Sequence, residues 1–450
     1  MLTHFPPLPF VIDCKAETRI GRKTPSAMNE LRLLLALKHH DRIQHIALQA
    51  SPRDWRPLFV HMNEPFRRTE HLSLTSTTTV KLTLPESFMA PNLRHLTLTG
   101  IGLPKGLPLL ASTLVTLKLC RIQSSSYFSP EDLVTRLQRM PHLKELSIDF
   151  STPIFRPNTE GELIQTPIPV VSLPALKQLE FHGRAAYLDR LVSMIHGPAL
   201  GRLTITLFNQ ASFTLPHLSQ FLKTAEELRH PISSIFFDRE AVSIAIRHHE
   251  PPFEDVFNLR VRCRRLNELI NSAAKVCGTL LPVLSIVEEL TLDSDENVCR
   301  SGQRDAVASA VWRDLILPFK HARKLSISHV LWWELSIALL HDDEGPPSFL
   351  CRLLPKLQTA EIEPEIQHPN GTSPQFINAR PLGLVVLPTS ALEAIDRSGS
   401  IISLPDSDEN SASHVSSVRS WPRSWLRRTI RFVNSVRNLK RLLLRFRSGS

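Results

Sequence analysis

Glycine is scarce in this sequence: 15 of the 450 residues are glycine, whereas 35 are proline. So few glycines disfavour folds that bind phosphate groups in glycine-rich loops. The six cysteines are scattered along the chain, and no two of them are spaced as CxxC. This pattern does not indicate a disulfide-bonded scaffold. We therefore expect reduced thiols and a cytoplasmic or nuclear protein.

Long apolar runs and common catalytic motifs are also absent. No run approaches the roughly 18 apolar residues that a membrane-spanning helix needs, so no transmembrane segment is expected. The sequence contains no GxxxxGKS/T, HExxH or GxSxG motif. We find no catalytic constellation and therefore predict that the protein is not an enzyme and needs neither a cofactor nor a metal ion.

The positive charge of the sequence is concentrated at its C-terminal end. Ten basic residues and no acidic ones follow Val418, and they account for the whole net charge of +10. The rest of the chain is balanced in charge. The sequence therefore gives little support to a general nucleic-acid-binding protein, and we expect no specific nucleic-acid partner.

Leucine is abundant, with 69 residues, and it recurs in the pattern apolar-x-x-apolar-x-apolar. Copies of the pattern begin at Leu93, Leu114, Leu143, Leu176 and Leu200, and less regular ones at Ile43, Thr69, Ile232, Val287, Ala322, Leu357 and Leu439. The stretch 257–261 alternates like a strand without the full pattern. Successive units up to residue 362 lie about 21 to 35 residues apart, which is the size of one supersecondary unit.

Helix signals alternate with these strand-like copies. Apolar residues take helical spacing in 29–40, 188–195 and 218–225. Ser129 followed by Pro130 predicts a capped helix that begins there. Prolines stand two residues before the first leucine of several copies, where a helix has to end before a strand begins: Pro91, Pro141, Pro174, Pro198 and Pro355.

This alternation predicts an α/β fold of the leucine-rich-repeat type, a right-handed solenoid with a curved parallel sheet inside and helices outside. We assign it to residues 1–393. A polar, serine-rich, disordered loop is expected over 394–420. Residues 421–450 are expected to form a basic helix and a last repeat-like strand that cap the array. An ordinary α/β fold with leucine-rich strands is the alternative.

The repeat region resembles the leucine-rich-repeat region of fungal F-box-type proteins. The segments that carry the resemblance span roughly residues 8–393: 34–43, 84–96, 208–210, 274–292 and 376–380. Such proteins carry an N-terminal F-box, a helical module that docks on the Skp adaptor of a cullin–RING ubiquitin ligase. Here Phe10-Val11-Ile12 already has the pattern of a first strand, so no F-box is seen. The resemblance implies either a lost F-box or a gene model that starts late.

The residues between the motif leucines predict a binding surface. Because side chains alternate along a strand, these residues share the concave face of the expected sheet. We select nine as candidate partner-binding residues: His95, Thr97, Lys118, Glu145, Asp149, Glu180, His182, Arg202 and Thr204. We place others on the same face: Thr99, Thr116, Ser147, Gln178, Thr206, Ser234, Phe236, Asp238, Glu289, Thr291, Asp293, Lys324, Ser326 and Ser328. The alternative is that they form only the solvated side of a sheet.

The C-terminal residues contain two further candidate sites. A short apolar run followed by acids resembles a SUMO-interacting motif, and an unstructured acidic linker is the alternative: Ile401, Ile402, Leu404, Asp406, Asp408 and Glu409. The basic tail either caps the array or forms a surface helix that is attracted to anionic lipid or nucleic acid: Arg427, Arg428, Arg431, Lys440 and Arg441.

These patterns favour a monomeric protein-interaction module. The resemblance implies that it is the substrate-recognition part of a Skp–cullin ubiquitin ligase, with a protein substrate on the concave face. A Skp-type adaptor is expected only if an F-box lies upstream. The alternatives are a stand-alone scaffold without a ligase link, and binding to an anionic surface through the basic tail.

Overall fold

The computed structural model describes residues 9–14, 27–77, 82–104, 112–123, 126–151, 170–208, 215–228, 230–238, 240–247, 255–262, 266–295, 308–339, 346–363 and 385–388. The chain divides into two units, Met1–Asp396 and Arg397–Ser450, and all described residues belong to the first. The predicted loop over 394–420 and the predicted cap over 421–450 therefore lie outside the described residues.

The described residues form an α/β structure whose main sheet has 15 strands and is open, with β1 and β17 at its edges. Its strands are β1 (Phe10–Cys14), β2 (Ile43–Ala50), β3 (His71–Ser76), β4 (His95–Thr99), β5 (Thr116–Ile122), β6 (Glu145–Phe150), β8 (Gln178–Gly183), β10 (Arg202–Leu207), β11 (Ile232–Phe237), β12 (Ala241–Arg247), β13 (Asp255–Arg262), β14 (Glu289–Ser294), β15 (Lys324–Ser328), β16 (Thr359–Glu363) and β17 (Val385–Pro388). Each predicted strand up to residue 362 is confirmed.

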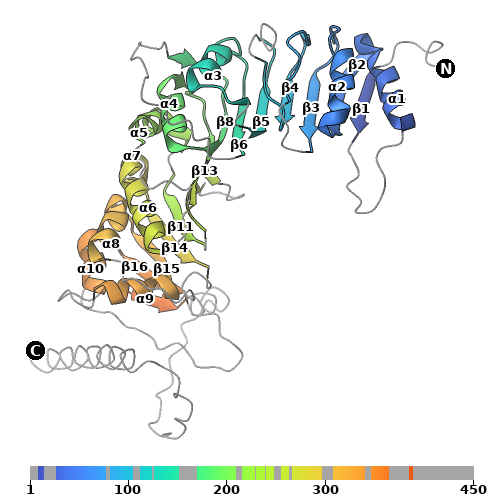
Figure 1. Cartoon of the computed structure of the whole chain (residues 1–450). Helices are drawn as coiled ribbons and strands as arrows, with labels where there is room; N and C mark the ends of the chain where they lie inside the picture. Colours follow the sequence, from blue (N-terminus) through green and yellow to red (C-terminus); the bar gives the residue numbers. More distant parts are fainter. Residues whose placement is uncertain are drawn as a thin grey trace, which may run out of the picture. The chain divides into compact units, whose positions relative to one another are not determined.

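Helices and short 3-10 turns connect these strands. They are α1 (Ala27–Leu37), η1 (His40–Arg42), α2 (Pro52–His61), α3 (Pro130–Leu137), α4 (Ala185–Ser193), α5 (Pro216–Thr224), η3 (Glu226–Leu228), α6 (Leu266–Thr279), α7 (Leu281–Leu284), α8 (Ser309–Ile316), η4 (Leu317–Phe319), α9 (His329–Ala338) and α10 (Pro346–Leu353). In Figure 1, α3, α4, α5, α7 and α6 follow one another along one side of the sheet.

The helix predicted to begin at Ser129 is confirmed as α3. The Ser129 hydroxyl accepts a hydrogen bond from the Asp132 backbone N–H at 3.0 Å, and the Asp132 carboxylate accepts one from the Ser129 N–H. This reciprocal pair satisfies two backbone donors that the first turn would leave unpaired. Ile195, which we predicted at the end of a helical stripe, instead lies in β9 (Ile195–His196), which pairs with β7 (Val171–Ser172).

The motif leucines build the core. Leu96, Leu117 and Leu146 are direct partners across the register of neighbouring strands, and each is at most 1% exposed. The same position continues through Leu179 and Leu203. These side chains belong to one continuous apolar cluster that includes the buried faces of the helices. Burial of each leucine contributes about 1.5–3 kcal/mol relative to exposure, so the repeated leucine is the main stabilising feature of the sheet.

Strand order departs from the prediction in one place. The sequence predicts that consecutive strands stack in parallel, but β10 pairs with β13 rather than with β11. Between them, β12 runs antiparallel to both β13 and β11, and β11 then pairs in parallel with β14. The sequence analysis missed β12 because its Ala241–Arg247 lacks the leucine motif.

Candidate functional site: the polar face of the sheet

The nine predicted partner-binding residues lie on β4, β5, β6, β8 and β10, on one face of the sheet. We call this the polar face; it is opposite the face that carries the buried leucines. The register of neighbouring strands aligns its residues in two complete rows. The first row is His95, Thr116, Glu145, Gln178 and Arg202, and the second is Thr97, Lys118, Ser147, Glu180 and Thr204. Strand alternation thus brings together residues up to 109 positions apart in the chain.

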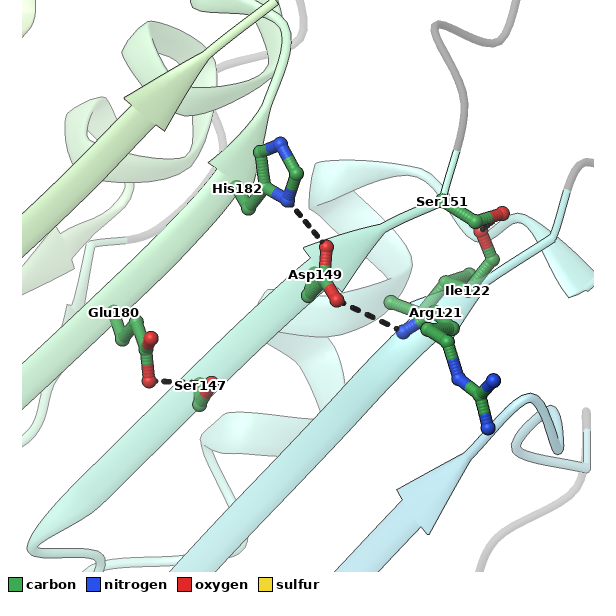
Figure 2. Close-up of polar contacts among 7 residues, drawn as sticks. All are labelled: Arg121, Ile122, Ser147, Asp149, Ser151, Glu180 and His182. Atoms are coloured by element: carbon green, nitrogen blue, oxygen red, sulfur yellow. Dashed lines mark hydrogen bonds and ion pairs between the residues drawn. The ribbon is translucent and has the colours of Figure 1, made fainter. Parts of the chain in front are cut away.

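A third row, in which Asp149 and His182 are register partners, contains a short polar contact. The Asp149 carboxylate and the His182 Nδ1 are 2.6 Å apart, and the other Asp149 oxygen accepts a hydrogen bond from the Arg121 backbone N–H at 3.2 Å. Figure 2 shows Asp149 between the other two residues. Burial raises the pKa of Asp149, but the contacts with His182 and Arg121 outweigh it, so that the net pKa is lowered. Asp149 is therefore an anion that fixes the orientation of the imidazole.

Arg121 reaches Asp149 through an unusual backbone conformation. Its φ is 52°, in the left-handed region that residues with a side chain rarely adopt. The register between β5 and β6 is irregular at this point, so the Arg121 N–H turns toward β6. Its guanidinium donates a hydrogen bond to the carbonyl oxygen of Ser76 at 2.8 Å. The sequence did not predict this conformation, because no glycine or asparagine marks the irregularity.

The other two acids of the predicted set also have partners. Lys118 and Glu145 form an ion pair at 3.3 Å with both side chains 41% exposed. The Ser147 hydroxyl donates a hydrogen bond to the Glu180 carboxylate at 3.0 Å, as Figure 2 shows. Each of the three predicted acids thus contacts a base or a hydroxyl donor on a neighbouring strand.

Three of the residues placed on the face are buried, contrary to the prediction. They are Thr116, Ser147 and Ser328. Ser147 lies beneath Glu180 and acts as its donor, and Thr116 contacts the His95 Nδ1 through its hydroxyl at 3.1 Å. Ser328 lies at the end of β15, where its hydroxyl meets that of Ser294 at 3.1 Å. Serine and threonine side chains are short, so longer side chains next to them cover their hydroxyls.

The Asp149–His182 pair raises the question of nucleophilic chemistry. The ring of His182 packs against Phe208, with centroids 4.8 Å apart, and its Nε2 is buried with no hydrogen-bond partner in the described residues. The nearby thiol is that of Cys120, and burial, followed by the charges of Asp149 and Glu180, raises its pKa. A raised pKa keeps the thiol protonated and weakens it as a nucleophile.

The remaining part of the polar face has its own ion pairs. Asp238 pairs with Arg260, and Lys324 with Glu361 at 3.5 Å. Phe236 is 39% exposed between these pairs, on β11. Asp238, Phe236 and Lys324 were predicted on this face. Arg260 was not, because the sequence does not indicate that β11, β12 and β13 lie side by side.

A stack of histidines at the N-terminal end of the face was also missed. His45, His71 and His95 occupy equivalent positions in β2, β3 and β4. The sequence carries a usable signal for it, because each histidine stands immediately before the second apolar residue of its motif copy. Only His95 was among the predicted residues.

The remaining predictions concern the C-terminal candidate sites, metal binding and membrane crossing. The SUMO-interacting-like residues 401–409 and the basic tail from 427 to 441 lie outside the described residues. Within the described part of the chain, no three His, Cys, Asp or Glu side chains are placed to hold a metal ion. No helix there combines the length and apolar character that a membrane crossing requires.

No protein-family model matches the chain, and no curated protein matches it significantly.

Proposed function

We propose that this protein is a non-enzymatic interaction module that binds a protein partner on its polar face, from β4 to β10. The observation that carries the proposal is the alignment of nine predicted residues, from five strands, on one half-exposed surface. Two of the acids contact a base on a neighbouring strand, Glu145 with Lys118 and Asp149 with His182. Such a surface selects a protein partner by complementary charge.

We further propose that the fold is a leucine-rich-repeat-like, right-handed solenoid. From β2 to β10, each strand of the main sheet pairs in parallel with the one that precedes it in that sheet. Each strand buries the same motif positions, and its outward residues fall in the same rows. In repeat proteins this construction gives an extended binding surface whose residues come from many strands.

By its resemblance, the bound partner would be a substrate that a Skp–cullin ubiquitin ligase modifies. In that role the polar face holds the substrate, and a separate ligase transfers ubiquitin. The role requires an F-box that links the protein to the Skp adaptor, and it places the protein in the cytoplasm or the nucleus. Without the adaptor, the same surface serves a stand-alone scaffold.

The test is capture of partners from native cells by the full-length protein, with two charge-reversal variants. The double variant Glu145→Lys/Glu180→Lys reverses two acids of the polar face. Glu86→Lys makes the same type of change at an exposed position in the loop between β3 and β4. We expect the double variant to lose the proteins that wild type and Glu86→Lys capture.

The outcomes separate the hypotheses. Capture of the same proteins by the double variant would contradict binding on the polar face. A Skp adaptor or a cullin in the wild-type eluate would support the ligase role. Partners without either would support the stand-alone scaffold. Partners that disappear on deletion of residues 419–450, and not in the double variant, would assign binding to the basic tail.

A further inference from the structure

Three histidines of the polar face are stacked on one another. The ring centroids of His71 and His95 are 4.3 Å apart with an interplanar angle of 7°, and those of His45 and His71 are 5.4 Å apart at 34°. All three are partly buried. Their stacking follows directly from parallel strands in register, which place equivalent side chains about 4.8 Å apart.

The stack continues the first row of the proposed binding face. Beyond His95 the row runs to Thr116 and Glu145. On the other side, Val11 of the edge strand β1 is the register partner of His45, and its side chain is exposed. The three imidazoles therefore form a continuous surface of the same face, next to its acid–base pairs.

The charged groups around the stack are unevenly placed. Arginines at the starts of β3 and β4 are exposed: Arg67, Arg68 and Arg94. Lys118 on β5 lies beyond His95, where it pairs with Glu145. Two carboxylates also belong to this end of the sheet. Glu70 directly precedes His71 and its charge acts on that imidazole, and Asp13 lies on β1, two residues after Val11, where its register partner is Ala47.

The stack is poorly suited to hold positive charge by itself. Burial, then the charges of His95 and His45, lower the pKa of His71, and Glu70 offsets only part of this. The central imidazole is therefore neutral near pH 7. A carboxylate that approached the stack would favour the imidazolium form, and its binding would then take up a proton.

The ring geometry disfavours a metal ion as the occupant. Metal ligation uses a nitrogen lone pair in the plane of the imidazole ring. In the His71–His95 pair the two planes are nearly parallel, so the lone pairs do not converge on one ion. An acidic peptide makes no such demand, because each imidazole can donate a hydrogen bond to a separate carboxylate.

We propose that the stack of His45, His71 and His95 binds an acidic segment of a protein partner, with uptake of at least one proton. This inference rests on the proposed function, since it assigns the partner chemistry of the same face. Exposed arginines in the segments that lead into β3 and β4, Arg67, Arg68 and Arg94, supply fixed positive charge, and His71 supplies charge that appears only on binding. Affinity for an acidic segment therefore rises as the pH falls from 8 to 6.

The test measures binding of a fluorescein-labelled deca-glutamate peptide to the full chain at pH 6.0 and pH 8.0, at constant ionic strength. Each imidazole that takes up a proton contributes roughly threefold to tenfold tighter binding at the lower pH. We expect His71→Gln to remove most of this difference. His142→Gln replaces an exposed histidine in the turn before β6 and should keep it.

The basic tail does not produce the same result. Lysine and arginine remain charged at both pH values, so peptide bound by the tail contributes equally to both measurements. A thermal melt of each variant checks that it is folded, and His45→Gln is the second variant if His71→Gln is not. Equal affinity at both pH values, or the same pH effect in the folded His71→Gln or His45→Gln variant, would overturn the proposal.

The peptide experiment and the capture experiment fail independently. Deca-glutamate does not require the natural partner, so pH-independent peptide binding removes only the histidine inference. Capture that survives reversal of Glu145 and Glu180 removes the proposed polar-face function, whatever the peptide does.

Discussion

Two regions of the main sheet bury alternate residues in the same way but assemble differently. From β2 to β10, strands enter the sheet in chain order and in parallel. From β11 to β13, they enter in reverse order, with β12 antiparallel between its neighbours. The buried motif positions are equally well packed in both regions; Ile205 of β10 and Ile235 of β11 are both fully buried. The leucine pattern thus determines which residues form a strand and which face is buried, but not the neighbour of that strand.

The connections decide the neighbour. The main-sheet strands β6, β8 and β10 are linked by long segments, with α4 between β8 and β10, whereas the β11–β12 connection is three residues, 238–240. Asp238 closes this turn, because its carboxylate accepts hydrogen bonds from the backbone N–H groups of Glu240 and Ala241. A parallel crossover needs about a dozen residues or more. A connection of three residues therefore permits only an antiparallel hairpin.

The largest expected effect separates the two regions. Ile244 is fully buried in β12, between Ile235 and Leu259. Ile244→Asp would bury a carboxylate without a partner, and we expect a loss of more than about 4 kcal/mol of unfolding free energy. Because each strand pairs only with its neighbours in the sheet, residues 232–363 should become sensitive to protease while a fragment covering 43–207 persists. Limited proteolysis with mass spectrometry measures both.

The control for that change is Ser243→Asp, on the polar face of the same strand. We expect it to cost less than about 1 kcal/mol, as for most surface substitutions. If Ile244→Asp made residues 43–207 as sensitive to protease as residues 232–363, the two regions would not unfold independently, and the prediction would be wrong.

A medium effect compares two equivalent Lys–Glu pairs. Both Lys118 and Glu145 are well exposed, whereas Glu361 is only 11% exposed beside Lys324. Lys324→Met leaves that carboxylate buried and unpaired, which we expect to cost about 1–3 kcal/mol in urea denaturation. Lys118→Met should cost at most about 1 kcal/mol, because solvent screens the exposed pair. Equal losses in the two variants would show that burial of Glu361 does not matter.

The smallest effect is a pH dependence in the regular region. The pKa of Asp149 lies below its ordinary value of 3.8, so its contribution to stability is present above that value and is lost as the pH falls through the lower, folded-state pKa. Asp149→Asn should therefore flatten the loss of melting temperature below about pH 4. Thermal melts between pH 2 and pH 6 measure the slope.

Asp189→Asn is the matched control, because the pKa of the Asp189 carboxyl is shifted in the opposite direction from that of Asp149. Burial raises the pKa of Asp189, although it accepts hydrogen bonds from the Leu218 and His217 backbone N–H groups. Its contribution to stability is greatest at acidic pH and falls as the pH rises through the raised pKa. Removal of the Asp189 carboxyl should therefore not flatten the loss of melting temperature below about pH 4. A flattened limb in this variant alone would reverse the assignment.

The sequence predicted strands better than their contacts. The motif located β2 to β6, β8, β10, β11 and β14 to β16, and simple alternation located β13, because burial of alternate residues is a local property. It also placed the nine candidate residues on one face. It could not predict the conformation of Arg121 or the burial of Ser147, because both depend on residues from other strands that are distant in the chain.

What the sequence determined by itself is therefore the position of most strands of the main sheet, the buried side of each of these and the alignment of polar residues in rows. These follow from a repeated spacing and from the free energy of leucine burial. Only the tertiary structure decided that β13 rather than β11 joins β10, that Asp149 contacts both His182 and Arg121, and that three histidines stack. Each depends on which strands become neighbours, and that depends on chain connections whose geometry the leucine pattern does not specify.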